Sequence, residues 1–268
     1  MEAATLEQFL APLIADPARS AVLLDVDGTL APITTDSYAA TVPQATRDVL
    51  GRVADRYGLV ACVTGRQCER AHEMVGLDNI TYFGNHGSEI MRAGSFKVEI
   101  APEAAAWQGS VQEFSKSAYT NFGLAKLGVR SEDKGPIMGL HWRGVENEAA
   151  AQAAVQQVAD AAESAGFGIH WAKKILEVRP PIEFSKGSAT RQLLDEQPMD
   201  NAIFVGDDLT DLHAFEALDE ARAAGKLKHA ARIGVDSDEA PPTLAPASDI
   251  VLSGTEAVRD MLDLLASA

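Results

Sequence analysis

Short apolar runs that end in glycine- or aspartate-rich turns recur along the chain, and longer helix-forming stretches separate them. Short runs of this kind are typical of strands buried on both faces, as parallel strands are. Their alternation with helical patterns predicts an α/β fold with a mainly parallel sheet. We expect strands at residues 21–26, 58–64, 80–84, 202–206, 231–235 and 249–252, and helices at residues 43–57, 69–75, 187–196 and 209–224.

The middle of the chain breaks this alternation. A helix and two strands are followed there by a second helix and two more strands, which predicts a separate α+β unit inserted into the sheet domain. We therefore expect a Rossmann-like core at residues 1–103 and 181–268, and an inserted unit at residues 104–180. The inserted elements are expected at residues 103–118, 128–134, 137–143, 147–165, 168–172 and 175–179.

Length and charge narrow the possible partners. A chain of 268 residues forms one or two domains. Its 23 Lys and Arg residues face 39 Asp and Glu residues, which gives a net charge of −16. Such a field repels phosphate backbones, so we do not expect nucleic acid as a partner. A small phosphorylated substrate is permitted where a metal ion or basic side chains act locally.

The sequence also suggests a compartment. Residues 1–21 lack the basic start and apolar run of a targeting segment, and no apolar run approaches the length of a membrane span. We interpret Cys62 and Cys68 as buried thiols rather than as a disulfide or a metal site. We therefore expect a cytoplasmic monomer that does not engage a membrane.

Acidic residues follow two of the expected strands. Asp25 and Asp27 lie in the segment DVDGT, directly after the first strand, and residues 206–211 (GDDLTD) follow the strand at 202–206. The carboxyl ends of parallel strands border the crevice in which α/β proteins bind ligands. Buried carboxylates repel one another, and hard oxygen ligands at this density suit Mg²⁺. Helix capping is the plainer alternative for either cluster alone.

Two further segments are ambiguous by themselves. Thr64-Gly65-Arg66 ends the second strand, and its hydroxyl and backbone N–H suit an anion at a helix start. Simple helix capping explains the same residues. Lys186 begins another helix, where a lysine is ordinarily a solvated surface residue.

Together, in this order, the DVDGT, TGR, KG and GDDLTD motifs resemble the haloacid dehalogenase superfamily of phosphatases. The resemblance implies that Asp25 is a nucleophile that forms an aspartyl-phosphate. It implies that Asp27 is the general acid and base, that Thr64 contacts a phosphoryl oxygen and that Lys186 keeps Asp25 ionised. The position of the inserted unit, between Thr64 and Lys186, matches the cap of the sugar-phosphatase branch, which closes over the site.

The same resemblance implies a Mg²⁺ cofactor. Its ligands would be Asp25, the backbone carbonyl of Asp27 and Asp207, with Asp208 and Asp211 in or near the next shell of contacts. We count Asp208 among the candidate metal residues. Catalysis of phosphoryl transfer needs such positioning and charge neutralisation.

Three more segments indicate one family within this superfamily. Residues 84–89 (GNHGSE), residues 132–134 (EDK) with 140–143 (LHWR), and residues 176–180 (LEVRP) resemble trehalose-6-phosphate phosphatases over nearly the whole chain. That family hydrolyses trehalose 6-phosphate to trehalose and phosphate. The alternative is a related phosphatase acting on another sugar phosphate, such as sucrose phosphate or a glycosylglycerate phosphate. A silent sugar-phosphate-binding regulator is a further alternative, which the presence of Asp25, Asp27 and Lys186 disfavours.

The resemblance also implies a substrate-binding set. Carboxylates and basic side chains recognise sugar hydroxyls through charge-assisted hydrogen bonds. Glu132 with Lys134 also fits a solvated cross-strand pair, His141 fits packing, and Arg179 fits a structural ion pair. The implied substrate-binding residues are Gly65, Arg66, Asn85, His86, Glu132, Lys134, Arg143 and Glu177.

Overall fold

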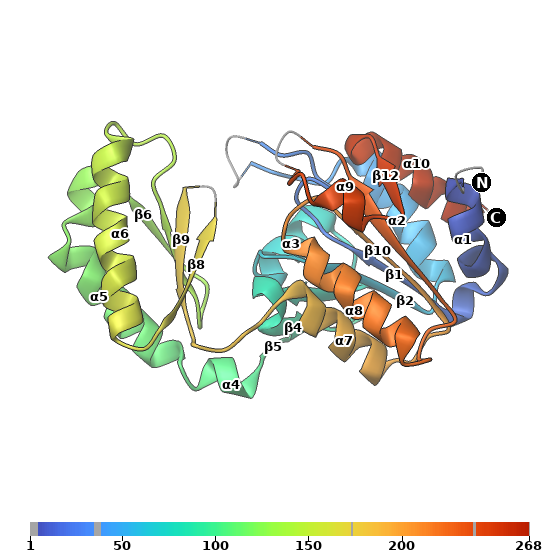
Figure 1. Ribbon diagram of the computed structural model, residues 1–268, viewed down its shortest axis with the longest axis horizontal. Coiled ribbons are helices and arrows are strands. Elements are labelled where there is room, and N and C mark those ends of the chain that lie inside the picture. The colour runs from blue at the N-terminus through green and yellow to red at the C-terminus, as the bar shows by residue number, and fades with distance from the viewer. Residues whose placement is uncertain (1–4, 35–38, 173, 238–239, 268) are drawn as a thin grey trace. The chain divides into compact units, whose positions relative to one another are not determined.

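The computed structural model describes residues 5–34, 39–172, 174–237 and 240–267. It divides the chain into two compact units, which are described separately below (Figure 1). The first unit joins Met1–Glu99 to Phe184–Ala268, and the second unit is Ile100–Glu183.

The first unit is built on an eight-stranded sheet with the order β12-β11-β10-β1-β2-β3-β4-β5. The strands from β12 to β3 pair in parallel, which confirms the expected α/β class, and β4 pairs antiparallel to β3. The six predicted strands are all present, whereas β4 and β5 were not predicted. The strands are β1 (Ser20–Leu24), β2 (Leu59–Val63), β3 (Thr81–Gly84), β4 (Glu89–Met91), β5 (Val98–Ile100), β10 (Asn201–Gly206), β11 (His229–Val235) and β12 (Ile250–Leu252).

Helices cover both faces of this sheet (Figure 1). Alternate residues of β1 divide between the faces: Val22 and Leu24 pack with four helices, and Ala21 and Leu23 with three others. The first face carries α1 (Leu6–Ala15), α2 (Gln44–Arg56), α3 (Cys68–Val75) and α10 (Gly254–Ser267), and the second carries α7 (Lys186–Glu196) and α8 (Asp211–Ala223), with the short α9 (Leu244–Ala247).

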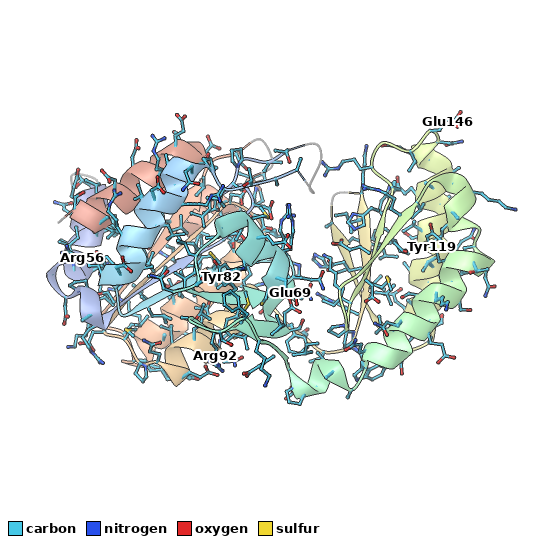
Figure 2. All side chains as sticks on the ribbon, turned by 180° about the vertical axis from the view of Figure 1, so that it is seen from behind. Arg56, Glu69, Tyr82, Arg92, Tyr119 and Glu146 are labelled. Atoms are coloured by element: carbon cyan, nitrogen blue, oxygen red, sulfur yellow. The ribbon has the colours of Figure 1, made fainter. Side chains whose placement is uncertain are left out.

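The apolar interior of the first unit contains a few polar atoms, and the Tyr82 hydroxyl is one of them. Tyr82 on β3, labelled in Figure 2, is fully buried, and its hydroxyl donates to the carbonyl of Leu77 at 2.7 Å. A buried phenol needs such a partner, because an unpaired hydroxyl in an apolar interior is costly. Cys62 and Cys68 are buried free thiols.

The second unit is an antiparallel four-stranded sheet, order β6-β7-β9-β8, with two long helices on one face. Met138, Leu140, Leu176 and Val178 form its core together with apolar residues of those helices. The helix expected at 103–118 is two helices, which a turn at Ala106 and Trp107 separates. The elements are α4 (Pro102–Ala105), α5 (Gln108–Asn121), β6 (Arg130–Asp133), β7 (Met138–His141), α6 (Glu148–Ser164), β8 (Gly168–Ala172) and β9 (Ile175–Arg179).

None of the helices within the described ranges has both the length and the apolar character that crossing a bilayer requires.

Candidate active site

Acidic side chains meet at the carboxyl ends of β1 and β10. Asp25 extends the β1 ladder, since its backbone N–H donates to the carbonyl of Val205 at 2.9 Å. Asp25 and Asp207 are each only 3% exposed. Gly28 permits this approach: its φ is +77°, and a Cβ there would lie 2.0 Å from the Asp207 Oδ2. The sequence therefore needs a glycine in DVDGT to bring the two carboxylates together.

Lys186 is the cation at the centre of this cluster. Its Nζ lies 2.9 Å from Asp25 Oδ1 and 2.7 Å from Asp211 Oδ1, with Asp208 Oδ1 3.6 Å away. Lys186 is 1% exposed and begins α7, whose N-cap is Ser185. Burial alone lowers the pKa of the ammonium, but the three carboxylates outweigh burial and hold the pKa well above its usual value. Lys186 is therefore a buried positive charge, not the solvated surface residue that its lone position also allowed.

The remaining negative charge of the cluster is suited to a metal ion. One carboxylate oxygen from each of Asp25, Asp207 and Asp211 lies within 4.8 Å of the other two. Asp207 Oδ1 is buried and has no hydrogen-bond partner among the described residues. Burial raises the pKa of Asp25 to about 8 and that of Asp207 to about 7, and neighbouring carboxylates add to both shifts. A divalent cation bound by oxygen ligands would hold these groups ionised, so the residues fit one.

Asp208 and Asp211 organise the loop after β10. Asp211 Oδ2 accepts from the backbone N–H groups of Asp207 and Asp208 at 3.0 Å each. Asp208 Oδ1 accepts from the backbone N–H and the hydroxyl of Thr210 and from the Asp211 N–H. Burial raises the pKa of Asp208, but Lys186 and these hydrogen bonds hold it well below its usual value. Both carboxylates thus fix the segment that carries Asp207.

Asp27 is held by an arginine. Arg66 Nε donates to Asp27 Oδ2 and Arg66 Nη2 to Asp27 Oδ1, both at 2.6 Å. The fork of a guanidinium matches a carboxylate in this two-point geometry, which is stronger than a single hydrogen bond. The side chain of Asp27 is 38% exposed, so the pair lies at the boundary between the buried cluster and solvent.

Thr64 and the GNHGSE segment form the adjoining wall. Thr64 is 1% exposed, and its hydroxyl accepts from the Arg66 backbone N–H at 3.2 Å. The His86 backbone N–H donates to the Thr64 carbonyl at 3.0 Å. His86 packs against Gly65, where a Cβ would lie 2.6 Å from its Cε1. Asn85 and His86 both have positive φ, at 48° and 57°, which places them in the left-handed region that costs non-glycine residues energy.

Two residues of the first unit were missed by sequence reasoning. Ser237 donates to Asp207 Oδ2 at 3.0 Å, from the segment after β11. Glu89 accepts from the Cys68 N–H at 2.5 Å and so caps the N-terminus of α3. Nothing in the sequence marks Ser237 beyond its place after a strand, whereas Glu89 closes the GNHGSE motif.

A second polar cluster lies within the inserted unit. Lys134 Nζ is 2.9 Å from Glu177 Oε1 and 3.9 Å from Glu132 Oε2, and His141 Nε2 is 2.8 Å from the same Glu132 oxygen. Lys134, His141 and Glu177 are all buried. The structure therefore joins Glu132, Lys134 and Glu177, and it adds His141, which sequence reasoning also interpreted as packing.

Arg143, also expected in this set, follows β7. It lies near Glu148, whose pKa is lowered first by hydrogen bonds from Lys174 and, to a smaller extent, by the charge of Arg143.

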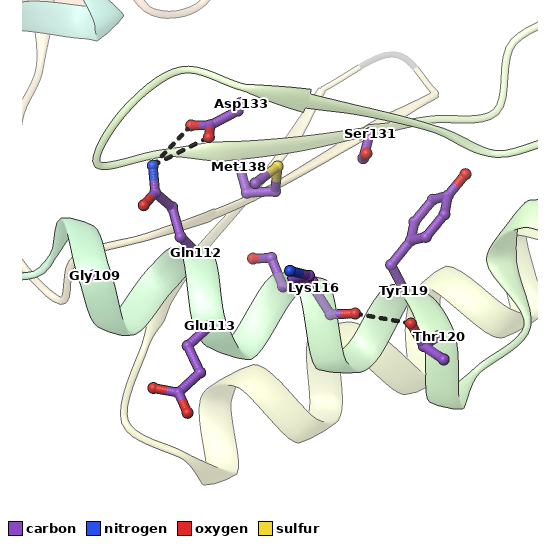
Figure 3. Close-up of a pocket in the computed structure, with 10 residues that line it drawn as sticks. Gly109, Gln112, Glu113, Lys116, Tyr119, Thr120, Ser131, Asp133 and Met138 are labelled. Atoms are coloured by element: carbon purple, nitrogen blue, oxygen red, sulfur yellow. Dashed lines mark hydrogen bonds between the residues drawn. The ribbon is translucent and has the colours of Figure 1, made fainter.

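A separate hollow of about 800 Å³ opens between α5 and β6 (Figure 3). Ser131, Asp133 and Met138 line it, and they alternate with Glu132 and Gly139 along their strands, so the hollow belongs to the helix-covered side of the sheet. Gln112 donates to both oxygens of Asp133 there. The hollow is thus distinct from the Glu132–Lys134–Glu177 cluster. Its other lining residues are Gly109, Glu113, Ser115, Lys116, Tyr119 and Thr120.

Solved structures resemble this chain over almost its full length. One, described as the C-terminal domain of trehalose-6-phosphate phosphatase from C. albicans, covers 98% of this chain and 97% of its own, with a TM-score of 0.76 and 21% identity. A haloacid dehalogenase-like hydrolase from Bacteroides thetaiotaomicron covers 91% and 98%, with a TM-score of 0.61 and 13% identity. At these identities the likeness establishes the haloacid dehalogenase type of fold.

Sequence comparison identifies the family. A probable trehalose-phosphate phosphatase G from Arabidopsis thaliana is 33% identical over 223 residues, which cover 75% of this chain and 59% of the relative. A trehalose-phosphate phosphatase from Mycobacterium marinum is 30% identical over 216 residues, 79% of this chain and 54% of the relative. This chain thus spans little more than half the length of these relatives. The sequence model of the trehalose-phosphatase family matches residues 23–247. The chain belongs to the trehalose-phosphatase family.

Proposed function

We propose that this protein hydrolyses trehalose 6-phosphate to trehalose and inorganic phosphate. The observation that carries the proposal is the buried cluster of Asp25, Lys186 and Asp207 at the ends of β1 and β10. Such a cluster suits phosphoryl transfer, which depends on positioning and on neutralising charge. The names of curated relatives, such as the trehalose-phosphate phosphatase from Mycobacterium marinum, supply the substrate.

The first half of the proposed reaction transfers the phosphoryl group to Asp25. A carboxylate oxygen of Asp25 forms a bond to phosphorus while the bond between phosphorus and the sugar oxygen breaks. The departing sugar oxygen takes a proton from Asp27 and leaves as the hydroxyl of trehalose. In the second half, water attacks phosphorus, Asp27 takes a proton from that water, and the bond to Asp25 breaks to release phosphate.

Arg66 and Lys186 prepare these two aspartates for their roles. Lys186, 2.9 Å from Asp25 Oδ1, favours the ionised nucleophile and offsets the charge of the transferring group. The two-point contact with Arg66 holds the Asp27 carboxylate in one orientation, from which it can accept a proton from water. We propose that the substrate phosphate draws Arg66 from Asp27 when Asp27 acts as the acid. Thr64 would donate its hydroxyl to a phosphoryl oxygen.

Mg²⁺ is the proposed cofactor. Asp25, Asp207 and the Asp27 backbone carbonyl would hold it, with Asp208 close by. When bound, it would supply positive charge against the phosphoryl oxygens. The orphaned Oδ1 of Asp207 supports this assignment.

We propose that the inserted unit, which the sequence predicted at residues 104–180, is a cap that provides sugar recognition. Glu132, Lys134 and Glu177 form a charged cluster, with Glu132 partly exposed, that can exchange hydrogen bonds with sugar hydroxyls. The further residues proposed to border the substrate are Arg143 from the inserted unit and Gly65, Arg66, Asn85 and His86 from the core.

We also propose that the enzyme is a monomer in the cytoplasm, a reducing compartment that would keep the buried thiols of Cys62 and Cys68 free. Size-exclusion chromatography with light scattering tests the first point, because a dimer would double the mass of 28.5 kDa.

Phosphate release from a panel of sugar phosphates, with Mg²⁺ and with EDTA, tests the proposed activity. We expect Mg²⁺-dependent release from trehalose 6-phosphate, far above release from sucrose 6-phosphate or glucosylglycerate phosphate. Faster release from another sugar phosphate would keep the Asp25 chemistry and overturn the substrate. Full activity in EDTA would overturn the cofactor.

A further inference from the structure

One face of the inserted sheet is free of the two long helices. Side chains alternate across a strand, and Leu140, Leu176 and Val178 pack with α5 and α6, so the residues between them belong to the other face. Strand register places Glu132 opposite Gly139, Gly139 opposite Glu177, and Glu177 opposite His170. Polar side chains from β6, β9 and β8 therefore form one row across this face, with a gap on β7 at Gly139.

His141 lies beside that gap. Its Nε2 is 2.8 Å from Glu132 Oε2, and a Cβ added at Gly139 would lie 3.0 Å from the same nitrogen and 3.5 Å from the same oxygen. Because an ionised carboxylate only accepts hydrogen bonds, Nε2 carries the hydrogen in this pair. A side chain at residue 139 would displace the imidazole or the carboxylate. The contact between His141 and Glu132 therefore depends on the glycine.

Within the described part of the chain, His141 is the side chain that gives Glu132 a hydrogen bond. Lys134 is 3.9 Å from Glu132 Oε2, too far for a hydrogen bond, and its Nζ donates instead to Glu177 at 2.9 Å. Burial raises the pKa of Glu132, but the hydrogen bond from His141 and the charge of Lys134 outweigh burial and lower that pKa. Without the imidazole, the Glu132 carboxylate would be free to turn toward the ammonium of Lys134.

We propose that His141 is a positioning residue that holds the Glu132 carboxylate over the bare Gly139 position, where it can accept a hydrogen bond from a sugar hydroxyl. This inference rests on the function proposed above and adds a residue to it. His141 does not touch the substrate. It fixes the direction of a group that does, so its loss weakens sugar recognition and leaves the phosphoryl-transfer step of the core unit unchanged.

The test compares two variants of His141 on two substrates. His141→Phe keeps an aromatic ring of similar size without the donor, and His141→Gln places an amide N–H near the position of Nε2. We expect His141→Phe to raise KM for trehalose 6-phosphate about tenfold, the usual scale for a lost hydrogen bond to a charged group. His141→Gln should stay within about threefold of the parent, and kcat should be unchanged in both. Turnover of p-nitrophenyl phosphate, which has no sugar, should match the parent.

Gly139→Ala provides a second route with His141 in place. Its added methyl group should displace the imidazole and reproduce the increase in KM. Gly109→Ala is the matched control, because a Cβ at Gly109 meets nothing within 4 Å. Thermal unfolding of each variant checks that the inserted unit is folded.

The outcomes separate this inference from the proposed function. A parental KM for trehalose 6-phosphate in folded His141→Phe or Gly139→Ala overturns the positioning role and leaves the function intact. Equal losses on both substrates also overturn it, because they indicate general damage. If the parent protein hydrolyses p-nitrophenyl phosphate but no trehalose 6-phosphate, the proposed function fails and the inference fails with it.

Discussion

A buried lysine lies at the centre of each polar cluster, yet the two lysines have different surroundings. In the core unit, Lys186 faces Asp25, Asp208 and Asp211, with Asp207 next to them. In the inserted unit, Lys134 pairs with Glu177, while Glu132 is held by a histidine. Around Lys186, four carboxylates face one basic side chain. Around Lys134, two carboxylates face a lysine and a histidine, so hydrogen-bond donors and acceptors are closer to balance.

This difference in charge indicates that the two clusters bind different ligands. Excess buried negative charge is unfavourable without a further cation, so the core cluster suits a metal ion and a phosphate. A balanced cluster cannot gain much from another ion, but its hydrogen-bonding groups can be shared with neutral hydroxyls. Substitutions in the core unit should therefore affect every phosphate ester, and substitutions in the inserted unit should affect the sugar ester alone.

The largest expected effect comes from Asp25, the proposed nucleophile. Asp25→Asn removes the attacking carboxylate and should lower kcat at least about a thousandfold, on trehalose 6-phosphate and on p-nitrophenyl phosphate alike. Thermal unfolding should show an intact fold, and Asp195→Asn, an exposed Asp-to-Asn change, should retain activity. Residual turnover of either substrate near the parental rate would refute the assignment of Asp25.

The next effect concerns stability. Lys186→Met leaves Asp25 and Asp211 without their buried cation, and breaking a buried pair in this way costs about 3–5 kcal/mol. We expect the free energy of unfolding in urea to fall by that amount and activity to be lost on both substrates. Lys226→Met, which removes an exposed lysine paired with Asp195, should change stability by no more than about 0.5 kcal/mol. Similar unfolding midpoints for the two variants would contradict the central role of Lys186.

The convergence of the core residues could be foreseen. Asp25, Thr64 and Asp207 each follow an apolar run, and parallel strands end at one edge of their sheet, so the positions had to meet once the strands were recognised. Lys186 needed the family resemblance, because nothing in its local sequence separates a buried lysine at a helix start from a solvated one. The pair between Arg66 and Asp27 joins residues 39 apart and depends on side-chain conformation, which no local pattern encodes.

The contacts of the inserted cluster were harder to foresee. Whether Glu132 meets His141 depends on the register of β6 against β7, and a shift of one residue would send each side chain to the opposite face. The helix α10 was not predicted, although its pattern is present in the sequence. Its buried residues are spaced as on one face of a helix: Val258, Met261, Leu262 and Leu265. The strand β4 has only three residues, too few for a reliable period.

A smaller and more selective effect is expected in the inserted unit. Glu177→Ala removes a carboxylate proposed to bind the sugar and the partner of Lys134, so kcat/KM for trehalose 6-phosphate should fall about a hundredfold. Turnover of p-nitrophenyl phosphate should be unchanged, because the core cluster is untouched. Asp133→Ala is the matched control: it removes a carboxylate of the same sheet that bonds Gln112 on the helix-covered side. Equal losses on both substrates would contradict the claim that the inserted cluster affects the sugar ester alone.

The smallest expected effect tests the proposed metal site of the core cluster. Ser237 donates to Asp207 Oδ2, so Ser237→Ala should leave that carboxylate free to rotate without removing a ligand. Loss of such an orienting hydrogen bond weakens metal binding about tenfold. The Mg²⁺ concentration at half-maximal activity should rise by that factor, while kcat at saturating Mg²⁺ stays parental on both substrates. Ser164→Ala in the inserted unit should not change this concentration. If Ser237→Ala changed only KM for trehalose 6-phosphate, Ser237 would act on the sugar. The proposal that only the inserted unit recognises the sugar would then be wrong.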